Sequence, residues 1–208
     1  MRQIYEALQS RKSELMGHQH FFKYAVMVPL VEINGELNVL FEERAHHLNR
    51  QPGEICFPGG KIDEDDADEM AAAVRETCEE LGLDQQAIEL LGPLDYMITS
   101  FHIVYPFAAR ISDYDQIRPN PDEVASVFGV PLEYLRSSTP ELHYVDLSVS
   151  PRDDFPYDRI PNGRNYKWGR GTVPEFFYYY EGRVIWGLTA RILNHFLEVT
   201  KSNNDQQS

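Results

Sequence analysis

Hydrophobic and polar residues follow two different periods along this chain, and the change of period predicts where its strands and helices lie. Apolar runs at 24–33 and 37–41 flank the dipeptide Asn34-Gly35, which is the strongest short signal for a β-hairpin. Residues 66–81 instead place apolar side chains about every 3.6 positions. This second period predicts a helix downstream of the hairpin.

The same reading predicts the remaining elements. They are a helix at 2–16, a short strand at 54–57, strands near 88–98, 102–111 and 124–131, and a last helix at about 184–200. Strands mixed with helices at both ends of the chain predict an α/β fold, an α/β/α sandwich around a central mixed β-sheet. Residues 1–208 are expected to form a single domain with a disordered tail at about 201–208.

The composition of the 208 residues is that of a globular protein, with 42% hydrophobic residues. No apolar run is long enough to span a membrane, so no membrane partner is expected. The two cysteines, Cys56 and Cys78, lack the spacing of a zinc site or a disulfide framework, which favours a cytoplasmic location. The formal net charge of −14 argues against a nucleic acid as partner, because its phosphate backbone needs positive charge.

Three glutamates lie close together on the helix predicted at 66–81. Residues three and four positions apart share a helix face, so Glu76, Glu79 and Glu80 are expected to form one carboxylate patch. The apolar stripe expected on the opposite side comprises Met70, Val74, Cys78 and Leu81. Because like charges repel, a hard divalent cation such as Mg²⁺ or Mn²⁺ is expected among these oxygens, with a solvated acidic face as the alternative.

The acidity of the chain is concentrated around this helix. Residues 61–80 contain nine acids and two bases, a charge of −7 and half of the total. An anionic substrate approaches such a surface only with cations that neutralise it, which fits a metal–pyrophosphate complex.

The order of residues from 59 to 83 resembles the Nudix box, G-x5-E-x7-R-E-U-x-E-E-x-G-U, in which U is aliphatic. The matching residues are Gly60, Arg75-Glu76, Glu79-Glu80 and Gly82-Leu83, with Thr77 in place of an aliphatic residue. The loop is one residue longer than the general pattern, so Asp66 best fills the early acidic position, with Asp63 and Asp65 as rivals. The resemblance implies a Nudix α/β/α sandwich and a metal-dependent hydrolase of pyrophosphate bonds.

The segment before this box is similar to that of the coenzyme A pyrophosphatase subgroup. The matching residues are Arg44, Ala45, Gly53, Phe57, Pro58, Gly59 and Gly60, followed by a loop of the form GGKxDxxD. The departures are Phe41-Glu42 in place of Leu-Thr, and Asn49 in place of Arg with Arg50 next to it. The similarity covers most of the chain, from about residue 22 to residue 197.

The resemblance also implies a set of metal ligands. Glu76 and Glu80 are expected as the principal ligands of Mg²⁺ or Mn²⁺, and the Gly59 carbonyl as a further oxygen donor. Glu79 is expected either as another ligand or as the base that positions the attacking water. Together these residues would hold the cation that activates water for in-line attack on phosphorus.

Two further residues are expected to assist the acids of the helix. Arg75 is expected to orient a carboxylate by pairing with Glu79, and also with Asp66. Glu123, with Asp122 close behind, is the candidate for an acid contributed by a later loop, and a plain loop acid is the alternative.

Arg44, Arg50 and Lys61 are the candidates for substrate binding through phosphate, although each could equally be a solubilising surface residue. The implied reaction cleaves coenzyme A or its derivatives to a 4′-phosphopantetheine-type product and 3′,5′-ADP. The alternatives are another small nucleoside-diphosphate derivative, such as ADP-ribose or a dinucleotide, and a non-catalytic binding protein on the same fold. The oligomeric state is left open, with a homodimer as one option.

Residues 144–173 are polar, aromatic and rich in proline and glycine. Long segments without regular structure are often functional, so this stretch is expected to form either a flap beside the substrate or a plain surface excursion.

Overall fold

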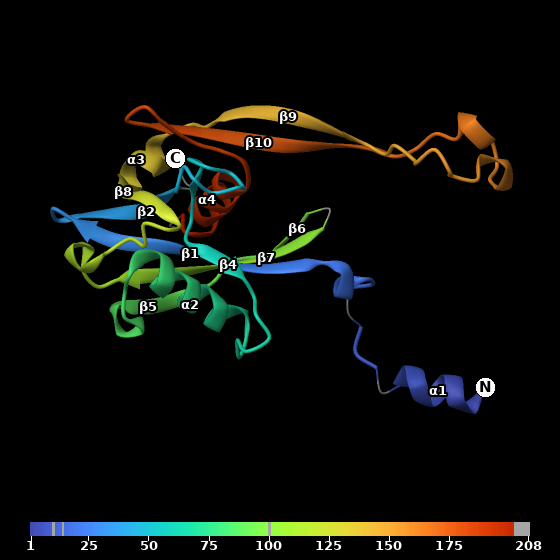
Figure 1. The fold of residues 1–208 in the computed structure, drawn as a ribbon, viewed down its shortest axis with the longest axis horizontal. Coiled ribbons are helices and arrows are strands. Elements are labelled where there is room, and N and C mark those ends of the chain that lie inside the picture. The colour runs from blue at the N-terminus through green and yellow to red at the C-terminus, as the bar shows by residue number, and fades with distance from the viewer. Residues whose placement is uncertain (10, 14, 100, 202–208) are drawn as a thin grey trace.

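The computed structural model describes residues 1–201 apart from positions 10, 14 and 100, and within them an eight-stranded mixed sheet forms the centre (Figure 1). Its strands are β1 (Phe22–Ile33), β2 (Glu36–Arg44), β3 (Ile55–Cys56), β4 (Gly59–Lys61), β5 (Ile88–Pro93), β6 (Met97–Ile98), β7 (His102–Ile111) and β8 (Val124–Pro131). The main path runs β3-β2-β1-β7-β5, while β4 pairs with β1, β6 with β7 and β8 with β2. The β1–β7 pair is parallel and its neighbours are antiparallel.

Different layers cover the two faces of this sheet. The helix α2 (Glu69–Leu81) lies on one face, and α4 (Gly187–Val199) lies on the other (Figure 1). A second, three-stranded sheet adjoins α4 and consists of β9 (Glu141–Ser148), β10 (Arg170–Tyr180) and β11 (Arg183–Ile185). The short helices are α1 (Arg2–Gln9) and α3 (Leu132–Ser137). This layering confirms the predicted α/β/α sandwich around a mixed sheet.

The strand β2 shows why the sheet needs cover on both sides. Successive residues point to opposite faces, so Leu40 packs with Leu81 of α2 while Phe41 packs toward α4. The Phe41 ring stacks on Phe57 and Phe128, with ring centroids 4.9 and 5.7 Å apart. A strand buried on both faces reads as a continuous apolar run, which is the pattern seen in its sequence.

Local sequence signals fix the ends of several elements. The turn between β1 and β2 has positive φ at both Asn34 (52°) and Gly35 (81°), as a tight hairpin turn requires, and the predicted hairpin is confirmed. The helix α2 begins at Glu69 rather than 66, because Asp68 caps it by accepting a hydrogen bond from the Ala71 amide at 2.8 Å.

Three predicted ranges need correction. The first helix ends at Gln9 rather than at 16 and buries none of its residues. The strand expected over 88–98 divides into β5 and β6, which are separated by residues 94–96, and the ladder of β5 with β7 has a further irregularity at Leu90/Gly92. The stretch 144–173 is not structureless, since both of its ends form the paired strands β9 and β10.

Two expectations concern the ends of the chain and membranes. Positions 202–208 of the predicted disordered tail lie outside the described residues. None of the helices in the described part of the chain is long and apolar enough to cross a membrane.

Replacing Gly82 with Ala should destabilise the fold more than the same change at Gly182. Both glycines are left-handed, with φ of 62° and 78°, and Ala pays roughly 1 kcal/mol for that conformation. Of the two, only Gly82 would place its added Cβ so that it overlaps the carbonyl oxygen of Arg118. Arg118 is held in position because its amide donates a 2.8 Å hydrogen bond to the Leu81 carbonyl. Urea unfolding should show a loss of about 3 kcal/mol for Gly82→Ala and about 1 kcal/mol for Gly182→Ala. Equal losses would contradict the close contact.

Candidate active site

The loop that carries the double glycine brings a backbone segment directly against α2. The strand β4 pairs antiparallel with β1, with Gly60 opposite Ala25 and Gly59 opposite Val26. Gly59 has φ of 151°, and a Cβ there would overlap the backbone of both β1 residues. A Cβ on Gly60 would overlap the Glu76 carboxylate. Close approach therefore requires both glycines, and Gly60 leaves the space in which the Glu76 carboxylate lies.

Glu80 is the buried acid of α2, with 5% of its surface exposed. Its Oε2 atom accepts a hydrogen bond of 2.7 Å from the Gly59 amide. Burial and, after it, the charges of Glu42, Glu76 and Glu123 raise the pKa of Glu80 to about 9, against the hydrogen bond from Gly59, which lowers it. The expectation that Glu80 faces away from the buried side of the helix is therefore wrong.

Glu42 is a second buried acid, and the sequence pattern did not identify it as a site residue. It lies in β2 and is 1% exposed. The Cys56 thiol donates to its Oε1 atom at 3.2 Å, while Oε2 is buried without a partner in the described part of the chain. Burial raises the pKa of Glu42 to about 7, against the opposing charge of Arg44. The sequence signal for Glu42 is an acid at the end of an otherwise apolar strand.

Arg75 joins the acids on the exposed side of the cluster. It donates two hydrogen bonds of 2.9 Å to Asp66 and one of 2.8 Å to Glu76, and it approaches Glu79 at 3.5 Å. The bonds from Arg75 lower the pKa of Asp66 to about 2, and the bond to Asp66 is the main cause that raises the pKa of Arg75. The predicted pairings of Arg75 with Asp66 and Glu79 are both present.

The three acids of α2 do not share one environment, as a single exposed patch would require. Glu80 is buried, Glu76 is half-buried and Glu79 is exposed. Burial is also the main cause that raises the pKa of Glu76. The buried side of the helix comprises Ala72, Ala73, Val74, Thr77, Glu80 and Leu81. Met70 and Cys78 of the expected stripe stay partly exposed, because the small side chains are the ones that pack onto the sheet.

Glu123 joins the cluster from a loop far along the chain. The loop is tied to α2 by a 2.8 Å hydrogen bond from the Asn120 amide to the Glu80 carbonyl. Glu123 is exposed, and its charge raises the pKa values of Glu42, Glu76 and Glu80. The structure therefore brings this candidate to the other acids.

The three basic residues expected to contact phosphate are placed differently. Arg44 is half-buried at the end of β2, and its charge acts on Glu42. Its Nε atom is buried and has no partner among the residues that the structure describes. Arg50 and Lys61 are exposed, and the Lys61 carbonyl accepts a 3.2 Å hydrogen bond from Arg75. The structure thus brings Arg44 to the acids and leaves the other two side chains at the surface.

The donor set fits a hard divalent cation. Oxygens of Glu76 and Glu80 lie beside the glycine loop, and Glu42 contributes a buried oxygen without a partner. A cation would stabilise the charged forms that burial and mutual repulsion now disfavour. In the described residues no three such side chains converge closely enough to form a ready-made coordination sphere. The Gly59 carbonyl remains a predicted ligand.

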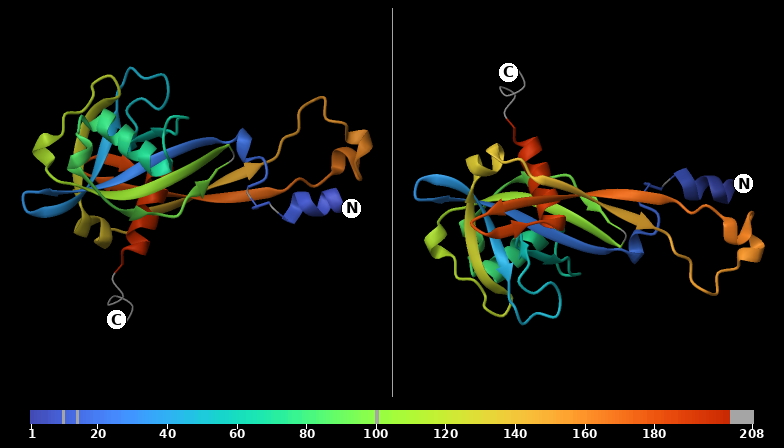
Figure 2. Two further views of the ribbon diagram at one scale, coloured as in Figure 1. Left: turned by 90° about the horizontal axis from the view of Figure 1, so that it is seen from below. Right: turned by 90° about the horizontal axis from the view of Figure 1, so that it is seen from above.

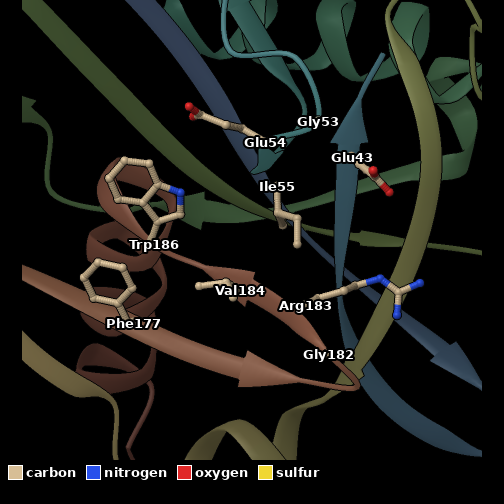
Figure 3. A pocket seen from close by; sticks show the side chains of 9 residues that line it. All are labelled: Glu43, Gly53, Glu54, Ile55, Phe177, Gly182, Arg183, Val184 and Trp186. Atoms are coloured by element: carbon tan, nitrogen blue, oxygen red, sulfur yellow. The ribbon is translucent and has the colours of Figure 1, made fainter. Parts of the chain in front are cut away.

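A pocket of about 520 Å³ lies on the other face of β2 from Glu42, because the next residue along the strand points the opposite way (Figure 3). Its lining comprises Glu43, Gly53, Glu54, Ile55, Phe177, Gly182, Arg183, Val184 and Trp186. The rings of Phe177 and Trp186 stack with centroids 5.9 Å apart, and the Arg183 guanidinium lies 4.4 Å from the Phe128 ring centroid. An aromatic wall beside charged groups suits a planar heterocycle with polar edges.

Comparisons with known proteins agree with this geometry. A family model described as the NUDIX domain matches residues 22–150. The peroxisomal coenzyme A diphosphatase NUDT7 of Mus musculus is 38% identical over 165 residues, which cover 75% of this chain and 69% of that protein. The uncharacterized Nudix hydrolase NudL of Yersinia pestis (strain Pestoides F) is 28% identical over 191 residues, covering 88% of this chain and 85% of that protein.

Two solved structures are similar at lower levels. An Ap4A hydrolase of C. elegans in a binary complex has a TM-score of 0.45 and 20% identity, covering 54% of this chain and 82% of its own. A MutT/nudix family protein from Enterococcus faecalis has a TM-score of 0.49 and 17% identity, and the match covers 95% of this chain and 68% of that protein.

The metal-free protein should lose stability as the pH rises from about 5 to about 9. The folded-state pKa values of Glu42 and Glu80, about 7 and about 9, exceed the ordinary value of 4.5, so the folded protein holds protons that the unfolded chain releases. That stabilisation is complete below the unfolded value and is lost as the pH passes the folded values. Urea unfolding in chelator at several pH values measures this loss, and Glu80→Gln should reduce it. A free energy of unfolding that is constant or rises over this range would contradict the raised pKa values.

Proposed function

Because this chain belongs to the Nudix hydrolase family and is a pyrophosphohydrolase, we propose that it cleaves the diphosphate bond of coenzyme A or its derivatives. The products would be a 4′-phosphopantetheine-type compound and 3′,5′-ADP. The observation that carries the proposal is the cluster of buried and half-buried acids packed against the double-glycine loop. The match of the 44–60 segment to the coenzyme A subgroup supports this substrate, as does the 38% identity to a coenzyme A diphosphatase.

The cofactor that we propose is Mg²⁺ or Mn²⁺, bound through Glu76 and Glu80 with Glu79 and the Gly59 carbonyl as further ligands. When bound, such an ion acts as a Lewis acid on the phosphoryl oxygens and lowers the pKa of water. The unpartnered Glu42 oxygen is an additional donor on the buried side.

The remaining roles that we propose follow from where each side chain lies. Arg75 holds the carboxylates of Asp66 and Glu76 in place and is not expected to touch substrate. Glu79 and Glu123 are exposed at the edge of the cluster, where either can accept the proton of the attacking water. Arg44, with a buried Nε that lacks a partner in the described part of the chain, is the donor best placed to meet a substrate phosphate.

The pocket beside Trp186 is proposed to bind the part of the substrate that is not phosphate. Two residues of its lining, Glu43 and Ile55, lie opposite each other in the β2–β3 ladder. Their neighbours along the chain, Glu42 and Cys56, form the next opposed pair of the same ladder. A substrate anchored there would carry its diphosphate past the edge of the sheet toward the acids. Arg50 and Lys61, whose side chains are exposed, are the remaining candidates for phosphate.

The other parts of the proposal concern the whole chain. Residues 1–208 are proposed to act as one domain on a small-molecule substrate. The free cysteines Cys56 and Cys78 favour a cytoplasmic location, although the Mus musculus relative is named as a peroxisomal enzyme.

Hydrolysis of coenzyme A should require Mg²⁺ or Mn²⁺, stop in excess EDTA and depend on Glu80. Glu80→Gln keeps the side-chain shape but removes the charge, so kcat should fall more than about 100-fold, beyond the effect typical of residues that only orient ligands. Glu89→Gln alters an exposed glutamate on β5 and is the matched control, with activity unchanged. The assay offers coenzyme A, ADP-ribose and diadenosine polyphosphates as separate substrates and measures the phosphate-containing products that each one yields. Good turnover of ADP-ribose together with no turnover of coenzyme A would assign another nucleoside-diphosphate substrate. No turnover of any of these compounds would favour a binding protein.

Trp186→Ala should raise KM for coenzyme A about 10-fold while kcat changes little. Stacking contributes roughly 0.5–1.5 kcal/mol beyond the area that it buries, and 1.4 kcal/mol corresponds to a factor of about ten. Tyr5→Ala removes another exposed aromatic ring, on α1 and away from the pocket, and should leave KM unchanged. Initial rates over a range of substrate concentrations separate the two constants. An unchanged KM in Trp186→Ala would remove the pocket from the substrate site.

A further inference from the structure

The strand β9 is an edge strand whose outer side pairs with no other strand in the described part of the chain. The order of its sheet is β11-β10-β9, and all eight residues of β9 are exposed. Figure 2 shows the β9–β10 ribbon projecting from the body of the molecule as an arm, which we define as residues 141–177. An exposed edge of this kind presents free amide and carbonyl groups to which another strand can pair.

The edge of β9 lacks most of the features that usually prevent such pairing, and its charged side chains are those of Glu141 and Asp146. It contains no Pro, Gly or Lys, and its ladder with β10 is regular. The outer edge strand β5 of the main sheet differs, because it has an irregular register at Leu90/Gly92 and ends at Pro93. The apolar residues along β9 are Leu142, Tyr144, Val145 and Leu147, which are between 46% and 65% exposed. A two-stranded ribbon exposed on both faces is marginally stable in water, so additional strands would stabilise the arm.

We propose that β9 pairs antiparallel with β9 of a second copy of this chain, so that the two arms form one continuous sheet across a two-fold axis. A two-fold axis perpendicular to the ribbon places β9 of the second copy antiparallel beside β9 of the first, so the outer edges of both strands are paired. Directly opposed residues of an antiparallel pair point to the same face of the sheet. The axis must therefore lie at one residue, which is opposed by the same residue of the second copy. The two central residues of the strand, Tyr144 and Val145, are the candidates for that position.

The charges of the arm favour a second copy as the occupant. The tip of the arm, residues 149–170, contains five bases and three acids, a net charge of +2 within a chain of −14. Antiparallel pairing takes the tip of one copy toward the end of the partner's β9 that joins the body. The exposed acids at that end, Glu133, Glu141 and Glu181, are paired within their own chain with Arg136, His143 and Arg183. The attraction therefore comes from the chain outside the tip, whose net charge is −14 less +2, or −16. Opposite charges therefore meet, while the two acidic bodies stay at opposite ends of the paired arms.

The proposal is tested by the oligomeric state of the full chain, measured by sedimentation equilibrium over a range of concentrations. Val145→Lys places a charge in the centre of the proposed interface, where like charges would meet, and should raise the dissociation constant of the dimer about 10-fold or more. Leu91→Lys makes the same change at an exposed leucine of β5, 54% exposed, and should leave the dimer intact. Urea unfolding of both variants verifies that they fold.

Cysteine cross-linking locates the interface independently. Residues on the two-fold axis bring their Cβ atoms to about 5 Å, close enough for a disulfide with small movements. Under mild oxidation, Tyr144→Cys or Val145→Cys should give a covalent dimer, and Leu91→Cys should not. A wild-type chain that stays monomeric at every concentration would overturn the proposal. A dimer that Val145→Lys leaves unchanged and that neither cysteine cross-links would overturn it as well.

Discussion

The hydrogen bond from the Gly59 amide to the Glu80 carboxylate connects the glycine loop to α2, and the arrangement of the site depends on it. A carboxylate that is only 5% exposed is costly unless its oxygens have partners, and a backbone amide is the partner provided here. The amide reaches Glu80 because β4 pairs with β1 through two glycines that no larger residue could replace without overlap. The burial of Glu80 therefore depends on the position of this loop.

The electrostatics of the cluster divide it into two sides. On the exposed side, Arg75 balances Asp66, Glu76 and Glu79 through bonds of 2.8 to 3.5 Å. On the buried side, the charge of Glu42 raises the pKa of Glu80, and the hydrogen-bond partners of these two acids are a thiol and an amide. The charge of Arg44 lowers the pKa of Glu42 but does not offset its burial. A divalent cation in this position would stabilise the ionised forms of these acids, which burial disfavours in the metal-free protein. An arrangement that costs stability in the isolated fold thus becomes the source of affinity for the proposed metal.

The sequence predicted features that depend on local conformation more accurately than features that depend on packing. The Asn34-Gly35 turn and the end of α2 before Gly82 were predictable, because positive φ selects these residue types locally. The orientation of Glu80 was not, since helical spacing states which residues share a face but not which face the sheet covers. Glu42 was missed for a related reason: its partners Cys56 and Glu80 are 14 and 38 positions away along the chain. The strand β9 was missed because exposure on both faces removes the burial pattern that identifies a strand, and β10 was missed with it because its first residues are exposed as well.

The central claim is that the buried acids hold protons which a divalent cation displaces. Calorimetric titration of the metal-free protein with Mn²⁺ near neutral pH, in two buffers that differ in ionisation enthalpy, measures the protons released on binding. Because the pKa of Glu80 lies at about 9, the account predicts a net release of protons that is smaller in Glu80→Gln. Binding without proton release, or release that the substitution leaves unchanged, would contradict the account.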